Sequence, residues 1–129
     1  MAGFFGIRSP FLELCGIRAV SREGGRVVAE AEVTPATANS FGFGHGGLTM
    51  TLLDVVCGAA ARFSDPEATS VVTVDLHVSF IGLAKGRLVA EGRVLRQVKR
   101  TVFCEGDVRT PDGSLVAKAL GTFQLRHRS

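Results

Sequence analysis

A single carboxylate, Asp54, lies in the middle of a long run of apolar and small residues, GLTMTLLDVVCGAAAR, at positions 47–62. A helix of this composition is apolar on every side, which predicts burial on every side. None of the residues three or four positions from Asp54 is a cation that could pair with it, these being Met50, Thr51, Cys57 and Gly58. Burying an unpaired carboxylate is costly. We therefore expect either that Asp54 faces a cleft and does chemistry, or that a strand residue binds it for packing alone.

The predicted helix begins at His45-Gly46-Gly47. The first amides of a helix have no internal acceptor, and together with the helix dipole they attract negative charge. Glycine lets a ligand approach this backbone closely, so the Gly46 amide could bind an oxygen that gains charge in a transition state. The alternative is that the two glycines only permit tight packing of the helix start.

Gly46 and Asp54 are separated by two helical turns, about 12 Å along the helix axis. One small reacting group cannot contact both residues within the same helix. Two copies of the chain related by a two-fold axis could bring the helix start of one copy to the carboxylate of the other. A homodimer is therefore an expected part of the chemistry.

The rest of the sequence predicts the elements that hold this helix. Ser9-Pro10 and Gly16 bracket a short helix, with the capping serine, the first-turn proline and the terminal glycine in their usual places. Patterns of apolar and polar residues predict strands at 17–20, 26–33, 70–81, 86–98, 100–109 and 114–127. Their short connections imply an antiparallel meander rolled around the central helix, which is an α+β fold.

Length and charge limit the classes of function. The 129 residues fit one domain, which we expect to span 1–129. The net charge of +3 is too mild to require nucleic acid, and an RNA-binding sheet would present several aromatics where only Phe103 lies near the cations. The cations do gather in one segment, at Arg93, Arg96, Lys99 and Arg100. Such a basic segment suits an anionic small ligand and is also typical of a solvated strand end.

Cysteine usage indicates the compartment. Cys15, Cys57 and Cys104 are odd in number and widely spaced, and the absence of a CxxC pair supports neither a zinc site nor a disulfide framework. Reduced thiols suit a cytoplasmic protein. The N-terminal MAGFFGIRSPF lacks the long apolar core of a signal peptide, and the apolar run at 52–61 is too short to cross a bilayer. We therefore expect a cytoplasmic protein with no membrane partner.

Two further groups of residues have a chemical interpretation and a plainer one. Cys57 could form a nucleophilic triad with His45 and Asp54, but a helical cysteine with apolar neighbours is usually a core residue. Alternation in the strand at 70–81 places three polar side chains on one face, Thr73, Asp75 and His77. Two potential ligands two residues apart do not make a metal site, so we expect no metal.

Asn39, His45-Gly46-Gly47 and Asp54 form a longer pattern, NSFGFGHGGLTMTLLD, which the stretches TVDLHVSF, GRLVAEGRVLRQVKRTVFCEGDV and DGSLVAKALGTF follow. In these stretches, over most of its length, the chain resembles the hotdog-fold acyl-CoA thioesterases of the PaaI-like family, which includes the mammalian thioesterase-superfamily-member-2 type. The resemblance implies a single hotdog domain in which a curved antiparallel sheet of five to six strands wraps around one long central helix. It also implies hydrolysis of an acyl-CoA thioester to a free carboxylic acid and CoA, with the CoA ester as substrate and no cofactor.

The resemblance assigns roles to five residues. Asp54 would be the catalytic carboxylate, acting as a base through a water or as a nucleophile. The Gly46 amide would polarise the thioester carbonyl, and Asn39 would help to hold that oxygen or position the water. His45 would shape the loop, and Thr73 would orient the water or the carboxylate. Members of the family place the Asp and the Gly in different subunits, so a homodimer is required and a homotetramer is expected.

The phosphates of coenzyme A give the basic segment a ligand, again as the resemblance implies. The residues expected to bind the CoA ester are Phe80, Arg96, Lys99, Arg100 and Thr101, with Phe80 beside the pantetheine. Phe41 and Phe43 could line an acyl or aryl pocket or fill the dimer interface. The acyl group stays open among arylacetyl, hydroxybenzoyl and medium-chain fatty acyl esters.

Two rival functions are compatible with the same fold. An enoyl-CoA hydratase or dehydratase of this fold pairs a His with an acidic residue and often places prolines next to the His, whereas His45 is followed by two glycines. A non-catalytic acyl-CoA-binding module would keep the basic segment and a pocket but would not need Asp54.

Overall fold

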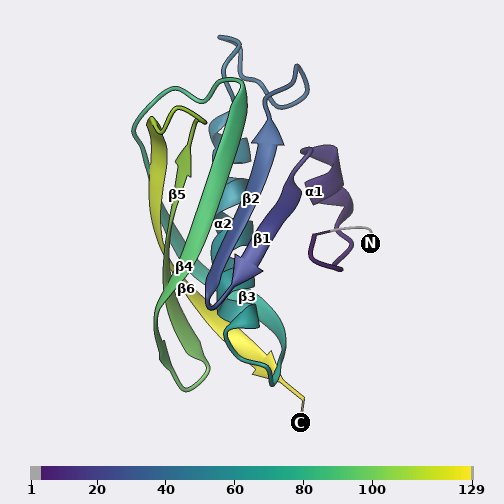
Figure 1. The fold of residues 1–129 in the computed structure, drawn as a ribbon, viewed down its shortest axis with the longest axis vertical. Helices are drawn as coiled ribbons and strands as arrows, with labels where there is room; N and C mark the ends of the chain where they lie inside the picture. The colour runs from purple at the N-terminus through teal and green to yellow at the C-terminus, as the bar shows by residue number, and fades with distance from the viewer. Residues whose placement is uncertain (1–3, 129) are drawn as a thin grey trace.

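The computed structural model describes residues 4–128 of the chain. Within this range the chain forms two helices and six strands (Figure 1), in the order α1 Pro10–Leu14, β1 Arg18–Glu23, β2 Arg26–Glu32, α2 Gly46–Phe63, β3 Ala68–Phe80, β4 Arg87–Val98, β5 Thr101–Arg109 and β6 Leu115–His127. This is the order that the sequence predicts. The expected single domain over 1–129 also includes residues 1–3 and 129, which lie outside the described residues.

The six strands form one antiparallel sheet in the order β1-β2-β4-β5-β6-β3. β4, β5 and β6 make the predicted meander, but β3 pairs with β6 at the edge of the sheet and not with β4. The expectation of a complete meander is therefore wrong. Alternation of residue types reports where strands lie, and the choice of partner depends on how the sheet closes around the helix.

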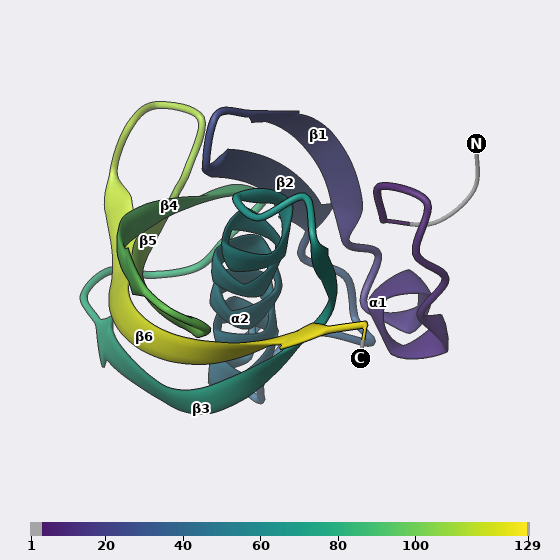
Figure 2. The same cartoon turned by 90° about the horizontal axis from the view of Figure 1, so that it is seen from below.

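α2 lies in the hollow of this curved sheet, as Figure 2 shows, which confirms the expected hotdog arrangement. Fully buried side chains such as Leu52 of the helix and Phe123 of β6 fill the space between them. The approach is closest at Gly92 of β4, where a β-carbon would lie 2.5 Å from the carbonyl of Val56. Glycine at this position therefore sets how near the helix can come to the sheet.

One stripe of α2 stays open, which corrects the expectation that the helix is buried on every side. Met50 is 42% exposed, and Thr51, Asp54 and Val55 near it are half-buried. The sheet of one chain covers the remaining faces of the helix. Asp54 therefore lies at the boundary of the core, where a ligand or a second copy of the chain can reach it.

The length of α2 also changes the interpretation of its apolar run. The run at 52–61 belongs to a helix of 18 residues, which by length and composition alone would suffice to cross a bilayer. However, 56% of the helix is buried within the molecule, which is the situation of a core helix.

Candidate active site

Asp54 lies beside β3 on the open stripe of α2. Its Oδ1 accepts a hydrogen bond of 2.7 Å from the hydroxyl of Thr73. The pair faces a largely apolar surface hollow of about 540 Å3, whose other walls come from α1, α2 and β3 and include Phe11, Met50 and Leu76. Among residues 4–128 no other hydrogen bond reaches this carboxylate. One oxygen is therefore held, and the second is available to a ligand.

A β-bulge brings Thr73 to the helix. The register between β3 and β6 shifts between Thr73 and Asp75, so that one extra residue enters the strand. As a result Val72 and Val74 are exposed, at 44% and 61%, and the Thr73 hydroxyl reaches the helix. The alternation in the sequence puts Thr73 on one face with Asp75 and His77. That expectation is wrong, because the extra residue reverses the faces at this point.

Asn39 organises the loop before α2. Its side-chain Oδ1 accepts hydrogen bonds from the backbone amides of Phe41, at 2.9 Å, and Phe43, at 3.2 Å, while the backbone amide of Asn39 donates to the Phe43 carbonyl at 2.7 Å. These bonds fold the loop back on itself and leave the side-chain NH2 group of Asn39 as its remaining polar group. Phe41, which is 83% exposed, and Phe43 line a hollow of about 360 Å3 together with Asn39.

The start of α2 closes this second hollow. His45 is the N-cap residue, and its ring Nδ1 accepts a hydrogen bond of 2.8 Å from the Gly47 amide. His45 therefore needs an unprotonated Nδ1 to cap the helix. No acceptor for the Gly46 amide is found within residues 4–128. The ring of Phe80 packs over Gly46, since a β-carbon there would lie 3.3 Å from Cε1 of that ring.

The predicted catalytic residues, together with Phe80, thus fall into two groups in one chain. Asp54 and Thr73 line one hollow, while Asn39, Gly46 and Phe80 line another, and no residue lines both. His45 belongs to the second group as its cap. This separation agrees with the two helical turns between Gly46 and Asp54.

The cations of the basic segment differ in whether a carboxylate already binds them. Arg93 is engaged by carboxylates of Glu91, Glu105 and Asp107, at 2.8 to 3.2 Å, so its place in an anion-binding segment is not supported. Arg96, Lys99 and Arg100 are exposed and have no carboxylate within 4.0 Å in the part of the chain that the structure describes.

A third hollow, of about 600 Å3, lies at the turn between β4 and β5. Lys99, Arg100, Thr101 and Phe103 line it, while Arg96 does not. The Thr101 hydroxyl donates to Gln124 of β6 at 3.0 Å. The turn itself requires Lys99 to adopt a left-handed backbone with a φ of 56°, which is uncommon for a residue other than glycine.

Cys57 is a core residue. Its side chain is fully buried between α2 and the sheet, and burial raises the pKa of its thiol far above the ordinary value. A thiol in this state is not a nucleophile. This agrees with the plainer of the two interpretations of the sequence.

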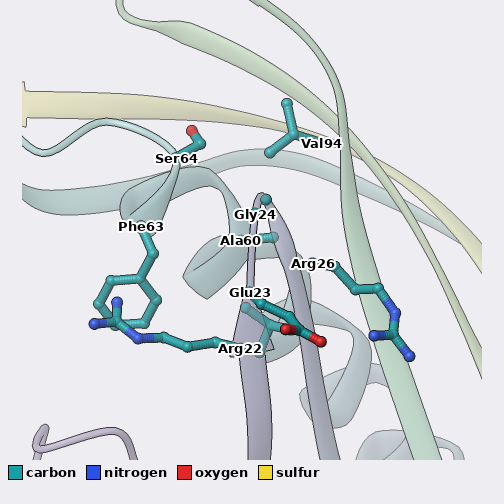
Figure 3. A pocket seen from close by; sticks show the side chains of 10 residues that line it. Arg22, Glu23, Gly24, Arg26, Ala60, Phe63, Ser64 and Val94 are labelled. Atoms are coloured by element: carbon teal, nitrogen blue, oxygen red, sulfur yellow. The ribbon is translucent and has the colours of Figure 1, made fainter.

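A fourth hollow, of about 610 Å3, lies elsewhere, at the C-terminal end of α2 (Figure 3). Its charged residues are Arg22, Glu23 and Arg26. The Arg22 guanidinium stacks on the ring of Phe63 at 3.9 Å, and Arg26 pairs with Glu91 at 3.0 Å. Both cations are already engaged, and none of the residues predicted to do chemistry lines this hollow.

Sequence reasoning misses one cluster of polar side chains. Asp65, Gln97 and His127 meet through hydrogen bonds although they come from three separate parts of the chain. Gln97 and His127 lie 32 and 62 residues from Asp65 along the sequence, so no local spacing could have revealed the cluster.

Comparison with known proteins adds a family to this geometry. The family model described as the thioesterase superfamily matches residues 41–117, which include Asp54, Gly46 and Thr73. Human acyl-coenzyme A thioesterase 13 is 32% identical over 112 residues, which cover 84% of this chain and 79% of the human protein.

Solved structures agree with this comparison. The zebra fish thioesterase superfamily member 2 is 30% identical and superposes with a TM-score of 0.79, covering 86% of this chain and 82% of its own. A Bacillus halodurans protein, solved with CoA, is 29% identical and superposes with a TM-score of 0.87, covering 96% of this chain and 83% of its own.

Proposed function

The chain belongs to the thioesterase superfamily and is a thioester hydrolase, and on this premise we propose that it hydrolyses acyl-CoA thioesters to a free carboxylic acid and CoA, with Asp54 as the catalytic carboxylate. The observation that carries the proposal is the hydrogen bond of 2.7 Å from Thr73 to Asp54, in a hollow open to a ligand. A carboxylate kept for packing alone would have both oxygens engaged within the core.

Asp54 has two chemical routes. As a general base, its second oxygen takes a proton from water, the water oxygen bonds to the acyl carbon, and the C–S bond then breaks as CoA leaves and takes up the proton. As a nucleophile, the same oxygen attacks the acyl carbon, CoA leaves, and water hydrolyses the acyl anhydride. Single-turnover hydrolysis in heavy-oxygen water tests the second route, because label enters the protein carboxylate only when water attacks the aspartyl carbonyl of the anhydride, and such label would refute a pure general-base route.

The Gly46 amide is the proposed partner of the carbonyl oxygen. An amide that has no acceptor in the chain, at the positive end of an 18-residue helix, suits an oxygen that becomes negative in the transition state. The NH2 group of Asn39, which lines the same hollow, is the proposed second donor or water ligand. His45 holds this backbone in place through its bond to Gly47.

A complete site requires two copies of the chain. The hollow of Asp54 and the hollow of Gly46 are separate, so we propose a homodimer in which the helix start of one copy meets the carboxylate of the other. The open stripe of α2 around Met50 supports this arrangement. A homotetramer in the cytoplasm is the larger assembly that we propose.

The CoA part of the substrate is proposed to bind at the turn between β4 and β5. Lys99 and Arg100 line the hollow at this turn beside Thr101, whose hydroxyl donates to Gln124. Together with Arg96 they are exposed cations with no carboxylate partner among the described residues. Such groups suit phosphates. Phe80, which packs over Gly46, would border the pantetheine as it approaches the carbonyl site. The aromatic rings of Phe41 and Phe43 favour an aryl or medium-chain acyl group.

A thiol-release screen tests the proposal. Wild-type protein is assayed over a panel of arylacetyl, hydroxybenzoyl and medium-chain acyl-CoA esters, beside Asp54→Asn and Asp54→Ala. Asp75→Asn is the matched control, because Asp75 is an exposed carboxylate two residues from Thr73 on the same strand. We expect turnover of at least one ester, lost in both Asp54 variants and kept in the control. Turnover that survives in the Asp54 variants would refute the assignment.

A further inference from the structure

Asp65, in the loop after α2, connects three parts of the molecule. Its Oδ2 lies 2.9 Å from Nε2 of His127 at the end of β6 and accepts a hydrogen bond of 3.2 Å from the Gln97 amide of β4. Its Oδ1 accepts from the Glu67 backbone amide at 2.9 Å. The side chains of Asp65 and His127 are each only 17% exposed. We call this group the Asp65 bridge, consisting of Asp65, Gln97 and His127.

Gln97 extends the bridge to the turn between β4 and β5. Its side-chain nitrogen also donates to the Lys99 carbonyl, at 2.9 Å. A glutamine amide has two N–H donors, and here one goes to Asp65 and the other to the turn. The carboxylate is therefore two hydrogen bonds away from the backbone of Lys99, the residue with the left-handed φ of 56°. A non-glycine residue keeps this conformation only where its surroundings hold it.

The opposite side of the turn is held by β6. The backbone amide of Leu125 donates to the Arg100 carbonyl at 2.7 Å, and the Thr101 hydroxyl donates to Gln124 at 3.0 Å. Lys99 and Arg100 thus leave the sheet from a backbone that is fixed from two directions. Their own side chains have no carboxylate partner in the described part of the chain.

The Asp65 bridge is not itself a catalytic pair. Nδ1 of His127 is buried and has no partner within residues 4–128, so this ring contacts no hydroxyl or thiol that it could activate. The bridge also lies outside the hollows that Asp54 and Gly46 line. Its contacts lead to the turn between β4 and β5 instead.

We propose that the Asp65 bridge positions the turn between β4 and β5 so that Lys99 and Arg100 meet the phosphates of the CoA nucleotide. The inference rests on the proposed function, in which this turn binds the nucleotide. Asp65 and Gln97 are then positioning residues, which touch no reacting atom and act through the backbone of Lys99. Their loss affects nucleotide binding and leaves the chemical step unchanged.

The test compares two substrates that carry the same acyl group, the CoA ester and the pantetheine ester, which lacks the nucleotide. Gln97→Leu removes both donors and keeps the Asp65–His127 contact, so it is the first variant. Asp65→Asn is the second, Glu67→Gln is the matched control at a neighbouring exposed carboxylate, and Lys99→Ala is the reference for loss of a phosphate contact.

For Gln97→Leu and Asp65→Asn we expect KM for the CoA ester to rise about three- to tenfold, the effect of one lost hydrogen bond. kcat for both esters and KM for the pantetheine ester should match wild type. A rise in KM for both esters, or a fall in kcat for the pantetheine ester, would mean a general structural role and overturn the inference.

Wild-type and Lys99→Ala protein distinguish a failure of the inference about the Asp65 bridge from a failure of the proposed nucleotide site at the turn. The inference alone is overturned if three results occur together: the wild type prefers the CoA ester, Lys99→Ala loses that preference, and the bridge variants keep it. If the wild type hydrolyses both esters with the same KM, the turn does not bind the nucleotide, and that part of the proposed function falls together with the inference.

Discussion

The Thr73 hydroxyl donates to Asp54 Oδ1 at 2.7 Å and so joins an edge strand of the sheet to the central helix. No cation lies beside this carboxylate on the helix, so the hydrogen bond is what fixes the orientation of the side chain. It leaves the second oxygen as the one that a ligand in the adjoining hollow can meet.

Replacing Thr73 by valine removes this hydrogen bond and keeps the shape of the side chain. We expect kcat to fall about tenfold to a hundredfold, the range for a hydrogen bond to a charged group, while KM changes little. Thr73→Ser, which retains the hydroxyl, should keep most of the activity. Steady-state thiol release measures both. A valine variant as active as the wild type would show that Thr73 does not orient the carboxylate.

Mixing two inactive variants should restore activity. Gly46→Pro removes the proposed amide donor, and the backbone of proline suits the first position of a helix after an extended residue such as His45. The Phe80 ring, 3.3 Å from the position of the added β-carbon, must shift slightly to admit it. When Gly46→Pro subunits combine with Asp54→Asn subunits, each heterodimer has one site in which the Gly46 amide and the Asp54 carboxylate are both intact. Random exchange should recover about a quarter of wild-type activity.

The control for this experiment is each variant mixed with itself, which should stay inactive. Circular dichroism and size-exclusion chromatography of Gly46→Pro establish that it folds and assembles. Mixtures that remain as inactive as the separate variants, despite demonstrated subunit exchange, would contradict a site shared between two copies.

The sequence predicts the elements of the fold well, and physical reasons explain where it stops. Strong alternation and clear turn residues mark the strands, and Ser9-Pro10 and Gly16 mark the first helix, all of which are local signals. The pairing of β3 with β6 is not local. The bulge at Val74 is invisible in the alternation because the apolar residues Val72 and Val74 face outward, against the usual rule.

In the candidate site, too, the sequence predicts the residues with a local signal and misses those that only the fold brings together. Asp54 and His45-Gly46-Gly47 stand out because a carboxylate in an apolar run and glycines at a helix start conflict with packing rules. The engagement of Arg93 by three carboxylates does not stand out, because two of them come from a different strand. Gln97 and His127 carry no local signal, and only the closed sheet brings them to Asp65.

The cysteines should differ in reactivity. Burial raises the pKa of the Cys104 thiol to about 12 and that of Cys57 further, and both side chains are almost fully buried. Cys15 is only partly buried. We expect iodoacetamide to modify Cys15 alone in the folded protein and all three thiols in urea. Mass spectrometry of tryptic peptides is the measurement, and labelling of Cys57 under native conditions would contradict its assignment to the core.

Gly92→Ala should unfold the protein or destabilise it by more than about 3 kcal/mol, the upper end for overpacked cores. The added carbon would lie 2.5 Å from the Val56 carbonyl, and helix backbone cannot yield as a flexible side chain can. Gly58→Ala is the matched control on the helix, where the added carbon meets Phe123 at 3.4 Å. We expect it to be neutral or stabilising by up to about 1 kcal/mol. Equal urea midpoints for the two variants would contradict this account of the helix–sheet contact.

Arg93 pairs with three acidic residues on the sheet, and we expect its replacement to lower the free energy of unfolding most at neutral pH. It donates to Glu91 at 2.8 Å and to Glu105 and Asp107 at 3.2 Å each. Arg93→Met leaves these carboxylates without their shared cation, so we expect a loss of about 1–3 kcal/mol in the free energy of unfolding. Arg96→Met, at an exposed arginine with no carboxylate partner in the described residues, is the control and should be neutral.

The pH dependence follows from Glu91. Burial opposes ionisation of its carboxyl, but hydrogen bonds from Arg26 and Arg93 outweigh burial and lower the pKa of Glu91 below its ordinary value. Its contribution to stability is therefore present above the unfolded pKa of about 4.3 and is lost as the pH falls through the lower folded value. Wild-type protein should lose stability steeply below about pH 4.3, whereas Arg93→Met, already without that contact, should lose less. Urea unfolding at a series of pH values measures both curves, and parallel curves would show that Arg93 does not set the pKa of Glu91.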